Sequence, residues 1–418
     1  MNTTEATTDV KETVAKLLPN AQQFLCDLMR YPSTPGQEHE VMLFAEREFA
    51  RIPGVTVQRV PMSEAIKQDP DYSDPVPDIK YDGRFNLRVV RKGSGGAAAR
   101  KLLFNAHTDV VPASEGQVDP FNPRVENGIV YGRGACDDKG QVATFHLLLH
   151  ALAALDITTA GDVVGHIVNE EENGGNGSLA MARTGEKADG CIVMEASEGK
   201  LFTSIRGAVW FKIIFHGKAG HSGQAAMTKS ALLMARDAMA LLEKYHADLL
   251  AGSRGIALFD PYPNPMPLTF GKLAAGNWPA AAPSRAQLEG VLGLLPNKTK
   301  EQVMAGMKAA LEADSTLAGH FDLSFMYRHD SSVVDPGHPF PRAIFAAARE
   351  TGVPLEVGAM TASCDAWFYN NQLDIPTVVY GPGTLKVAHS KDEQIPLKEI
   401  AASAELLVTL VKDFCGAA

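Results

Sequence analysis

Short apolar segments that alternate with helical segments constrain the fold of this chain more than any other feature. Four apolar runs have the length of buried strands: residues 87–90, 102–105, 163–168 and 190–194. A helical pattern covers residues 141–155 between the second and third runs. Strands separated by helices predict a largely parallel sheet with helices on both faces. Before them, residues 11–52 predict an amphipathic helix interrupted at residues 31–36, and the Pro- and Asp-rich residues 60–82 predict a loop.

The middle third of the chain follows a different order and predicts a second unit inserted into the first. Its segments read strand, helix, strand, strand, helix, strand: residues 208–216, 225–250, 266–272, 285–294, 300–313 and 322–327. This order is typical of a ferredoxin-like α+β unit. After this unit, helices followed by strands are again predicted, and the chain closes with a helix at residues 397–414. We therefore predict an α/β domain built from residues 1–206 and 330–418, interrupted by an inserted domain of residues 207–329.

The charge balance argues against polyanionic partners. The 418 residues include 39 Lys and Arg against 49 Asp and Glu, a net charge of −10. An acidic chain without a basic cluster is a poor candidate for binding nucleic acid or an anionic membrane. No apolar run approaches the ~20 residues of a membrane-spanning helix, and the first residues lack the pattern of a signal peptide. Because the five cysteines form no disulfide framework, we expect a soluble cytoplasmic protein with small-molecule or protein partners.

Five motifs place histidines or carboxylates directly after predicted strands or in the adjoining turns. Their chemistry-bearing residues are His107 with Asp109, Asp137 with Asp138, the run Glu170 to Glu172, Glu195, and His389. Ligands bind where parallel strands end at their carboxyl side, so these side chains are expected to converge. Several carboxylates stay ionised in one pocket only when a cation neutralises them. A mixed imidazole and carboxylate set suits zinc, or a related divalent metal such as cobalt or manganese.

Each motif alone has a plainer interpretation. The glutamates could form a solvated acidic loop, Glu195 could cap a helix, and His389 could be a surface histidine; convergence at one edge favours the metal site. Three competing patterns carry less weight. The glycines near residue 95 lack a dinucleotide fingerprint, the chain has no GxSxG serine nucleophile, and His146 and His150 share an apolar helix face that predicts packing.

The joint occurrence of these motifs resembles a known family. In chain order they read HTDVVP, GRGACDDKG, EEENGG, IVMEAS, GKAGHSG and GPGTLKVAHSKDE. The chain resembles, over nearly its whole length, the di-zinc amidohydrolases and exopeptidases that include acetylornithine deacetylase, succinyl-diaminopimelate desuccinylase, aminoacylase and glutamate carboxypeptidase. The resemblance implies a zinc-exopeptidase-like three-layer catalytic domain with an inserted ferredoxin-like domain that serves dimerisation and as a lid. It also implies a homodimer.

The resemblance assigns roles residue by residue. It implies that Asp137 bridges two zinc ions, and that the ligands are completed by His107 and Glu195 in one site and by Glu172 and His389 in the other. Glu171 would be the general base, and Asp109 would orient His107. The peptide bond between Asp137 and Asp138 would be cis. A slip of one residue would give the roles of Glu171 and Glu172 to Glu170 and Glu171, but then Asn173 would stand where the family has glycine.

The inserted domain contributes further candidates by the same resemblance. His221 would stabilise the oxyanion in the active site of the other subunit, although without the resemblance it reads as a turn histidine. Asn277 would contact substrate. Arg328 stands near the place of a carboxylate-binding arginine but reads equally well as a surface charge, and Lys200 is a weaker candidate for that carboxylate. The family's Asp-x-Arg is absent, because this chain has Glu289-Gly-Val-Leu at that place.

The predicted reaction is hydrolysis of an amide bond in a small substrate that bears a carboxylate, by a water that Glu171 activates. An N-acyl amino acid deacylase similar to acetylornithine deacetylase is the first hypothesis. A carboxypeptidase or dipeptidase of the same family is the alternative, since fold and metal site serve both. An inactive relative that acts as a binding or scaffold protein is the alternative from another class, and the complete set of ligands and base argues against it.

Overall fold

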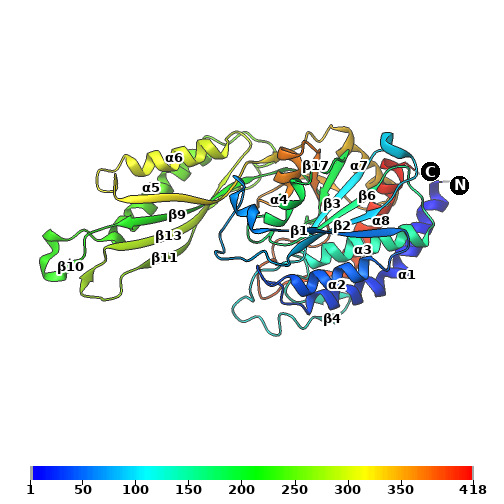
Figure 1. Cartoon of the computed structure of the whole chain (residues 1–418). Helices are drawn as coiled ribbons and strands as arrows, with labels where there is room; N and C mark the ends of the chain where they lie inside the picture. Colours follow the sequence, from blue (N-terminus) through cyan, green and yellow to red (C-terminus); the bar gives the residue numbers. More distant parts are fainter. Residues whose placement is uncertain (1–2, 417–418) are drawn as a thin grey trace.

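A nine-stranded mixed sheet forms the centre of the larger part of the molecule, on the right in Figure 1. The computed structural model describes residues 3–416. The order of its strands is β1 (Val55–Pro61), β2 (Phe85–Arg91), β6 (Val163–Val168), β3 (Leu102–His107), β7 (Gly190–Val193), β17 (Thr377–Val379), β8 (Lys200–Ile205) and β15 (Ser332–Val333), with β16 (Glu356–Met360) beside β8. The neighbours β6, β3, β7 and β17 are parallel.

The sheet is less parallel at its edges than the sequence predicts. Strands β1, β2 and β6 pair antiparallel, as does β8 with both β17 and β15. Parallel neighbours need a crossover of about a dozen residues or more, usually a helix. Between β1 and β2 the chain forms only the short 3₁₀ helix η1 (Glu64–Gln68), so these strands lie antiparallel. The predicted loop of residues 60–82 is wrong at its start, where β1 extends to Pro61.

Helices cover both faces of this sheet and produce three layers. One face packs against α1 (Thr3–Met29), α2 (His39–Phe49), α3 (Lys139–Ala154), α7 (Pro339–Thr351) and α8 (Leu397–Phe414), and the other against α4 (Asn176–Ala182) and the π-helix η4 (Phe368–Gln372). Successive side chains of a strand point to opposite faces. Accordingly Leu102 and Phe104 join the first apolar core and Leu103 joins the second. The predicted interruption near residues 31–36 is confirmed between α1 and α2.

The middle segment forms a four-stranded antiparallel sheet with two helices on one face, extending to the left in Figure 1. The strands lie in the order β11 (Leu268–Ala275), β13 (Arg285–Leu294), β9 (Gly207–His216) and β14 (Phe321–His329), and the helices are α5 (Ala231–Ala251) and α6 (Lys300–Glu312). The chain order β9-α5-β11-β13-α6-β14 is the predicted one. Helix α5 begins later than predicted, because residues 222–227 form the 3₁₀ helix η3 (Ser222–Met227).

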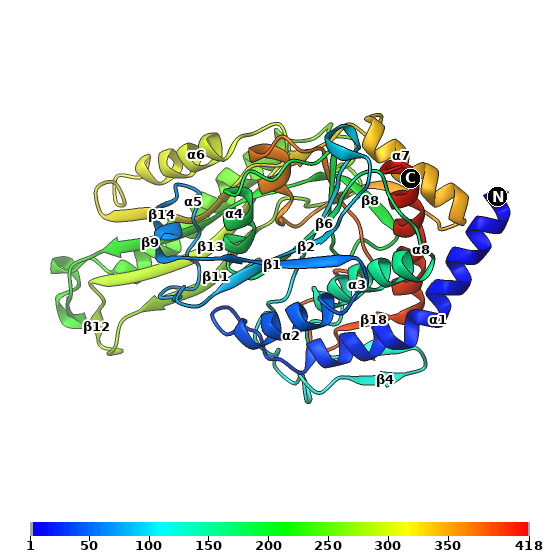
Figure 2. The same ribbon diagram turned by 45° about the vertical axis from the view of Figure 1, so that its right-hand side comes forward.

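Alternation along the strands of this inserted unit decides which face the helices cover. In β9, Phe211 and Ile213 are fully buried in the core beneath α5 and α6, whereas Trp210 and Lys212 lie half-buried on the opposite face. That opposite face is left uncovered by helices of its own unit (Figure 2), and Trp210 and Val291 on it line a cavity together with residues of the larger part of the molecule. Within residues 3–416, no helix has the length and apolar character needed to cross a bilayer.

The histidine pair on α3 packs in the core, as the sequence interpretation favoured. The ring of His146 is stacked on Phe24 with 4.0 Å between centroids, and it meets His150 at 4.4 Å. Burial, assisted by the nearby His150, lowers the pKa of His146 to about 3. The imidazole therefore stays neutral in the folded protein throughout the range in which a free histidine titrates, near pH 6.5.

This buried histidine predicts a pH-dependent loss of stability. Below pH 6.5 the unfolded chain binds a proton at His146 and the folded chain does not, so the free energy of unfolding falls by about 2 kcal/mol between pH 7 and pH 5 from this residue alone. We expect His146→Leu to flatten that decline, measured by denaturant unfolding at both pH values. The exposed His320→Gln serves as the control and should leave the decline unchanged. Equal declines in the wild type and His146→Leu would contradict this assignment.

Candidate metal centre

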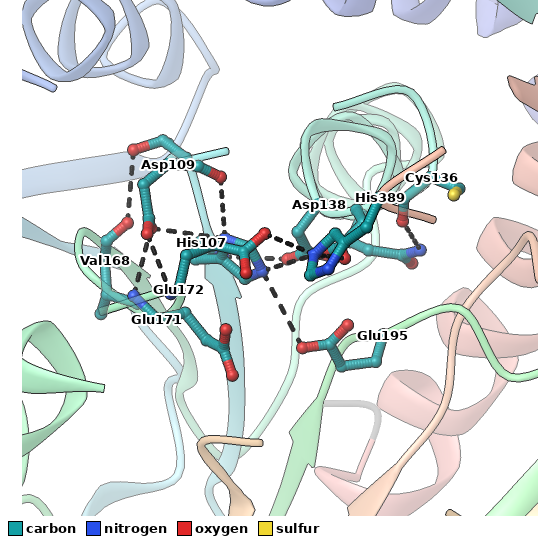
Figure 3. A network of polar contacts seen from close by, with 12 residues as sticks. His107, Asp109, Cys136, Asp138, Val168, Glu171, Glu172, Glu195 and His389 are labelled. Atoms are coloured by element: carbon teal, nitrogen blue, oxygen red, sulfur yellow. Dashed lines mark hydrogen bonds and ion pairs between the residues drawn. The ribbon is translucent and has the colours of Figure 1, made fainter. Parts of the chain in front are cut away.

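The carboxyl ends of the parallel strands bring the five sequence motifs to one edge of the sheet (Figure 3). His107 is the last residue of β3, Glu171 and Glu172 follow β6, and Glu195 follows β7. The remaining members are Asp137, in the turn before α3, and His389, in the segment after β17. Because β6, β3, β7 and β17 run in the same direction, their ends meet, and residues far apart in the chain become neighbours.

The carboxylate of Asp137 is shared by two groups of side chains. Its Oδ1 lies 3.2 Å from Nε2 of His107, and its Oδ2 lies 3.1 Å from Nε2 of His389. Glu195 adds an oxygen 3.9 Å from Nε2 of His107, and Glu172 adds one 2.9 Å from Nε2 of His389. In each group of three, the potential ligand atoms lie within 4.8 Å of one another. A carboxylate whose two oxygens face different groups can bridge two metal ions.

The chemistry of these groups fits divalent cations. Nε2 of His107 is buried and has no hydrogen-bond partner among the described residues. An unpaired buried nitrogen of this kind is destabilising, and a bound metal ion would satisfy it. Burial, together with the neighbouring carboxylates, raises the pKa of Glu195 well above its usual range. Around His389, burial opposes protonation, but Asp137 and Glu172 outweigh it and raise the pKa to about 11. The edge therefore attracts positive charge, and carboxylates with imidazoles are the ligands that zinc and related metals take.

Asp109 holds three of these groups in place. Its fully buried carboxylate accepts hydrogen bonds from the backbone N–H groups of Glu171 at 3.2 Å and Glu172 at 3.0 Å. The same carboxylate lies 3.3 Å from Nδ1 of His107, which is also 3.0 Å from the Asp109 carbonyl oxygen. In metal-binding histidines, a hydrogen bond from one ring nitrogen to a carboxylate or carbonyl oxygen fixes the orientation of the ring and leaves the other nitrogen for the metal.

A second buried network holds the turn that carries Asp137. The peptide bond between Asp137 and Asp138 is cis, as the resemblance implied. The backbone N–H groups of Cys136 and Asp137 donate to one carboxylate oxygen of Glu393, each at 3.3 Å, and Arg133 pairs with the other oxygen. Sequence reasoning missed Arg133 and Glu393, although both belong to motifs that it quoted.

The three consecutive glutamates separate into two environments. Glu170 turns away from the two groups, and its buried carboxylate pairs with Arg84 and accepts from the hydroxyl of Tyr81 at 2.8 Å. Glu172 belongs to the second group. Glu171 projects into the space beside Glu195, and no hydrogen bond of its side chain to another residue of the described chain is present (Figure 3). This geometry favours the register in which Glu171 and Glu172, and not Glu170, face the centre.

A cavity of about 450 Å³ opens over these carboxylates. The larger part of the molecule contributes the acidic floor, and the inserted unit contributes Trp210, Val291 and Tyr327. Arg206, at the junction between β8 and β9, also lines the cavity, and its side chain is 8% exposed. It donates to the carbonyl oxygens of Thr361 and Gly207, and burial lowers its pKa to about 10. No carboxylate among residues 3–416 forms an ion pair with it, and sequence reasoning did not select it.

The structure does not bring four of the predicted residues to this cavity. His221 in β10 (Gly220–His221) and Asn277 are exposed near the far end of the inserted unit, where β10 pairs with β12 (Ala281–Ala282). Arg328 donates to the backbone carbonyl oxygens of Phe325, Pro70 and Tyr72 instead of lining the cavity. Lys200 lies half-buried at the start of β8, also outside the lining.

Comparison with known proteins identifies the family. Residues 103–413, which hold the shared Asp137, both histidines and the glutamates, match the family described as peptidase family M20/M25/M40. The chain belongs to this family. Membership makes it an enzyme that hydrolyses amide C–N bonds, and it confirms the resemblance drawn from the motifs. The M20 family is metal-dependent, in agreement with the two groups of ligands.

Curated relatives of this M20 chain include three enzymes named for the removal of an acyl group. They are N-formyl-4-amino-5-aminomethyl-2-methylpyrimidine deformylase of Bacillus subtilis (26% identical, 80% of this chain and 84% of the relative), succinyl-diaminopimelate desuccinylase of Variovorax paradoxus (29%, 75% and 82%) and acetylornithine deacetylase of Klebsiella pneumoniae (27%, 82% and 86%). Among solved structures, the dipeptidase Dug1p of Saccharomyces cerevisiae has a TM-score of 0.79 at 14% identity, with 99% of each chain covered. That likeness shows the shared fold.

The shared carboxylate predicts distinct metal contents for variants of this M20 enzyme. We expect the wild type to retain two divalent ions per chain after dialysis against zinc, and His389→Ala to retain one, because only the second group loses a ligand. Asp137→Asn should lose most of both. Elemental analysis of the dialysed proteins measures the contents. Glu198→Gln, an exposed acidic residue paired with Lys386 outside both groups, is the control; equal contents in Asp137→Asn and the wild type would refute the bridge.

Proposed function

We propose that this M20 enzyme removes the acyl group from N-acyl amino acids with two divalent metal ions, zinc by preference and cobalt or manganese as substitutes. The observation that carries the proposal is the carboxylate of Asp137, whose two oxygens face two separate ligand groups. Three curated relatives, by name a deformylase, a desuccinylase and a deacetylase, support deacylation. His107, Asp137 and Glu195 would hold one ion, and Asp137, Glu172 and His389 the other.

The chain's own residues supply the proton transfers. Two bound divalent ions would polarise the scissile carbonyl and lower the pKa of the attacking water. Glu171 lines the cavity and is free of side-chain hydrogen bonds to the described residues, so it can accept a proton from that water and pass it to the leaving amine. Its backbone N–H is fixed by Asp109, which holds Glu171 and Glu172 in register. Glu171 thus serves as base and then acid, while Asp109 positions it.

Arg206 supports a substrate that carries a carboxylate. Its guanidinium lines the cavity, and two of its N–H groups are used by backbone carbonyl oxygens. Because no carboxylate of the described residues pairs with it, this guanidinium can form charge-assisted hydrogen bonds with a carboxylate of the substrate. This residue offers the function for which Arg328 and Lys200 were considered, and it does so from inside the cavity.

A homodimer is part of the proposal. His221 and Asn277 lie near the tip of the inserted unit, far along the molecule from the metal-ligand edge in Figure 1. Their proposed roles, oxyanion stabilisation by His221 and substrate contact by Asn277, therefore require that the tip of a second copy reaches this cavity. The five cysteines are free and buried, which agrees with a reducing cytoplasmic location.

The general-base role of Glu171 predicts that its substitution lowers turnover but leaves metal binding intact. We expect Glu171→Gln to keep both metal ions and to lower kcat by about 10²–10⁴-fold, the usual contribution of general acid–base catalysis. The measurement is hydrolysis of N-acetyl amino acids, with metal content determined on the same sample. Glu170→Gln, whose carboxylate faces Arg84 and Tyr81, distinguishes the two registers: if it abolished turnover and Glu171→Gln did not, the assignment would be reversed.

The role of Arg206 predicts discrimination between a carboxylate and an amide. We expect Arg206→Gln to lower kcat/KM for N-acetyl amino acids by about 10–100-fold, the contribution of a hydrogen bond to a charged group. The corresponding N-acetyl amino acid carboxamides should be affected little. Arg328→Gln is the matched control, because its guanidinium bonds to backbone carbonyl oxygens outside the cavity, and it should keep the carboxylate-to-carboxamide ratio.

The same assay separates the proposed function from its alternatives. Dipeptides with a free amino group, added to the substrate series, test for a dipeptidase or carboxypeptidase, which the family name also covers. The dipeptides and the N-acetyl amino acids compared each carry one carboxylate. If the dipeptides are hydrolysed faster, the assigned function is that of a peptidase and not of a deacylase. Family membership and the complete set of ligands and base argue against an inactive scaffold.

A further inference from the structure

A second, smaller cavity of about 250 Å³ adjoins the metal-ligand cavity. The two share Glu172, Trp210 and Val291, so the smaller one begins directly beside a proposed metal ligand. Beyond these residues its surface is largely apolar, with Pro75, Val76 and Met326 among its lining residues. Its other charged lining residues, Lys272 and Glu289, pair with each other at 3.4 Å. Apart from the shared Glu172, nothing in the proposed chemistry uses this space.

The floor of this apolar cavity is the uncovered face of the inserted sheet. Each of its four strands supplies a lining residue: Gly271 from β11, Val291 from β13, Trp210 from β9 and Met326 from β14. The two edge strands bulge at the cavity, because pairing is irregular between Phe270 and Lys272 and between Phe325 and Tyr327. Gly271 is the extra residue of the first bulge, and its missing side chain leaves room above the sheet.

The opposite wall is a loop held from two sides. The N–H of Asp74 donates to the carbonyl oxygen of Met326 at 3.0 Å, and Arg328 donates to the carbonyl oxygens of Pro70 and Tyr72 at 3.0 and 2.7 Å. From the larger part of the molecule, Asn173 accepts from the N–H of Val76 at 2.8 Å. The wall that carries Pro75 and Val76 is therefore fixed to both parts of the molecule, and the cavity is preformed.

We propose that this cavity binds an apolar group of the substrate, so that the enzyme selects amides with a hydrophobic side chain or acyl group. The inference rests on the proposed function and deepens it by naming the substrate class. An apolar cavity of about 150 Å³ suffices for a benzene ring, so about 250 Å³ admits a leucyl or phenylalanyl side chain. The carboxylate-binding Arg206 and this cavity together define a substrate with one anionic and one apolar end.

Gly271→Val tests the cavity by filling it. A Cβ at Gly271 would meet one atom, the carbonyl oxygen of Glu289, at 4.0 Å, and the backbone there lies outside the left-handed region, so a side chain is accommodated. Val76→Ser is the second variant; it makes the opposite wall polar at a side chain that is already 40% exposed. Ala274→Val, at an exposed residue of the same strand that lines neither cavity, is the matched control.

The experiment compares kcat/KM for N-acetylglycine, N-acetylleucine, N-acetylphenylalanine and N-benzoylglycine with the zinc-loaded protein. We expect the wild type to favour the apolar substrates over N-acetylglycine by at least about 10-fold. Gly271→Val should remove that preference while hydrolysis of N-acetylglycine stays within about twofold of wild type. Val76→Ser should weaken the preference, and Ala274→Val should preserve it. The benzoyl substrate shows whether the apolar group belongs to the acyl side or the amine side.

Three results would overturn the inference and leave the proposed function intact. The first is a wild type that hydrolyses these amides at rates independent of the apolar group. The second and third concern Gly271→Val and Val76→Ser together: an equal loss on all substrates in both variants, or an unchanged preference in both. A wild type that hydrolyses none of them with zinc, cobalt or manganese would overturn the proposed function and the inference with it.

Discussion

Repulsion among the carboxylates gathered around Asp137 is the constraint on which the rest of the structure depends. Asp137, Glu171, Glu172 and Glu195 share one edge of the sheet, and burial raises the pKa of Glu171 and Glu195 well above the usual range. Like charges at close range cannot all ionise unless cations compensate them. The fold must therefore hold these groups together against a force that separates them. In the proposed metal centre, bound divalent cations would neutralise these carboxylates and remove the repulsion.

Backbone hydrogen bonds oppose this repulsion. Each carboxylate follows a buried strand or sits in a turn whose N–H groups are bonded, so the side chains converge without needing to attract one another. Asp109 fixes the chain after β6 through two N–H donors, and Glu393 fixes the turn before α3 through two more. Glu393 is balanced by the buried Arg133. The two ligand groups, by contrast, have no Lys or Arg partner among the described residues, which leaves them for cations.

Three residues of the metal-ligand edge could be predicted from the sequence because each stands close to the end of an apolar segment. His107, Glu172 and Glu195 stand directly after apolar strands, and parallel strands must end at the same edge. Features that depend on pairing between distant segments were not predicted. Strand β8 is a short mixed segment whose place is set by its partners β16 and β17. Arg206 is held at the cavity by hydrogen bonds to the carbonyl oxygens of Thr361, far along the chain, and of its neighbour Gly207.

The bulges of the inserted sheet could not be predicted for the same reason. The two parts of the molecule contribute different features to the cavities. The ligand groups belong to the larger part, where a change in one residue disturbs the balance of charge. The apolar walls at Trp210, Val291 and Gly271 belong to strands whose buried side chains face their own helices. A substitution on the uncovered face leaves that core and the proposed metal ligands intact. Under the proposed function, substrate preference would therefore change through the inserted sheet while the hydrolytic chemistry is preserved.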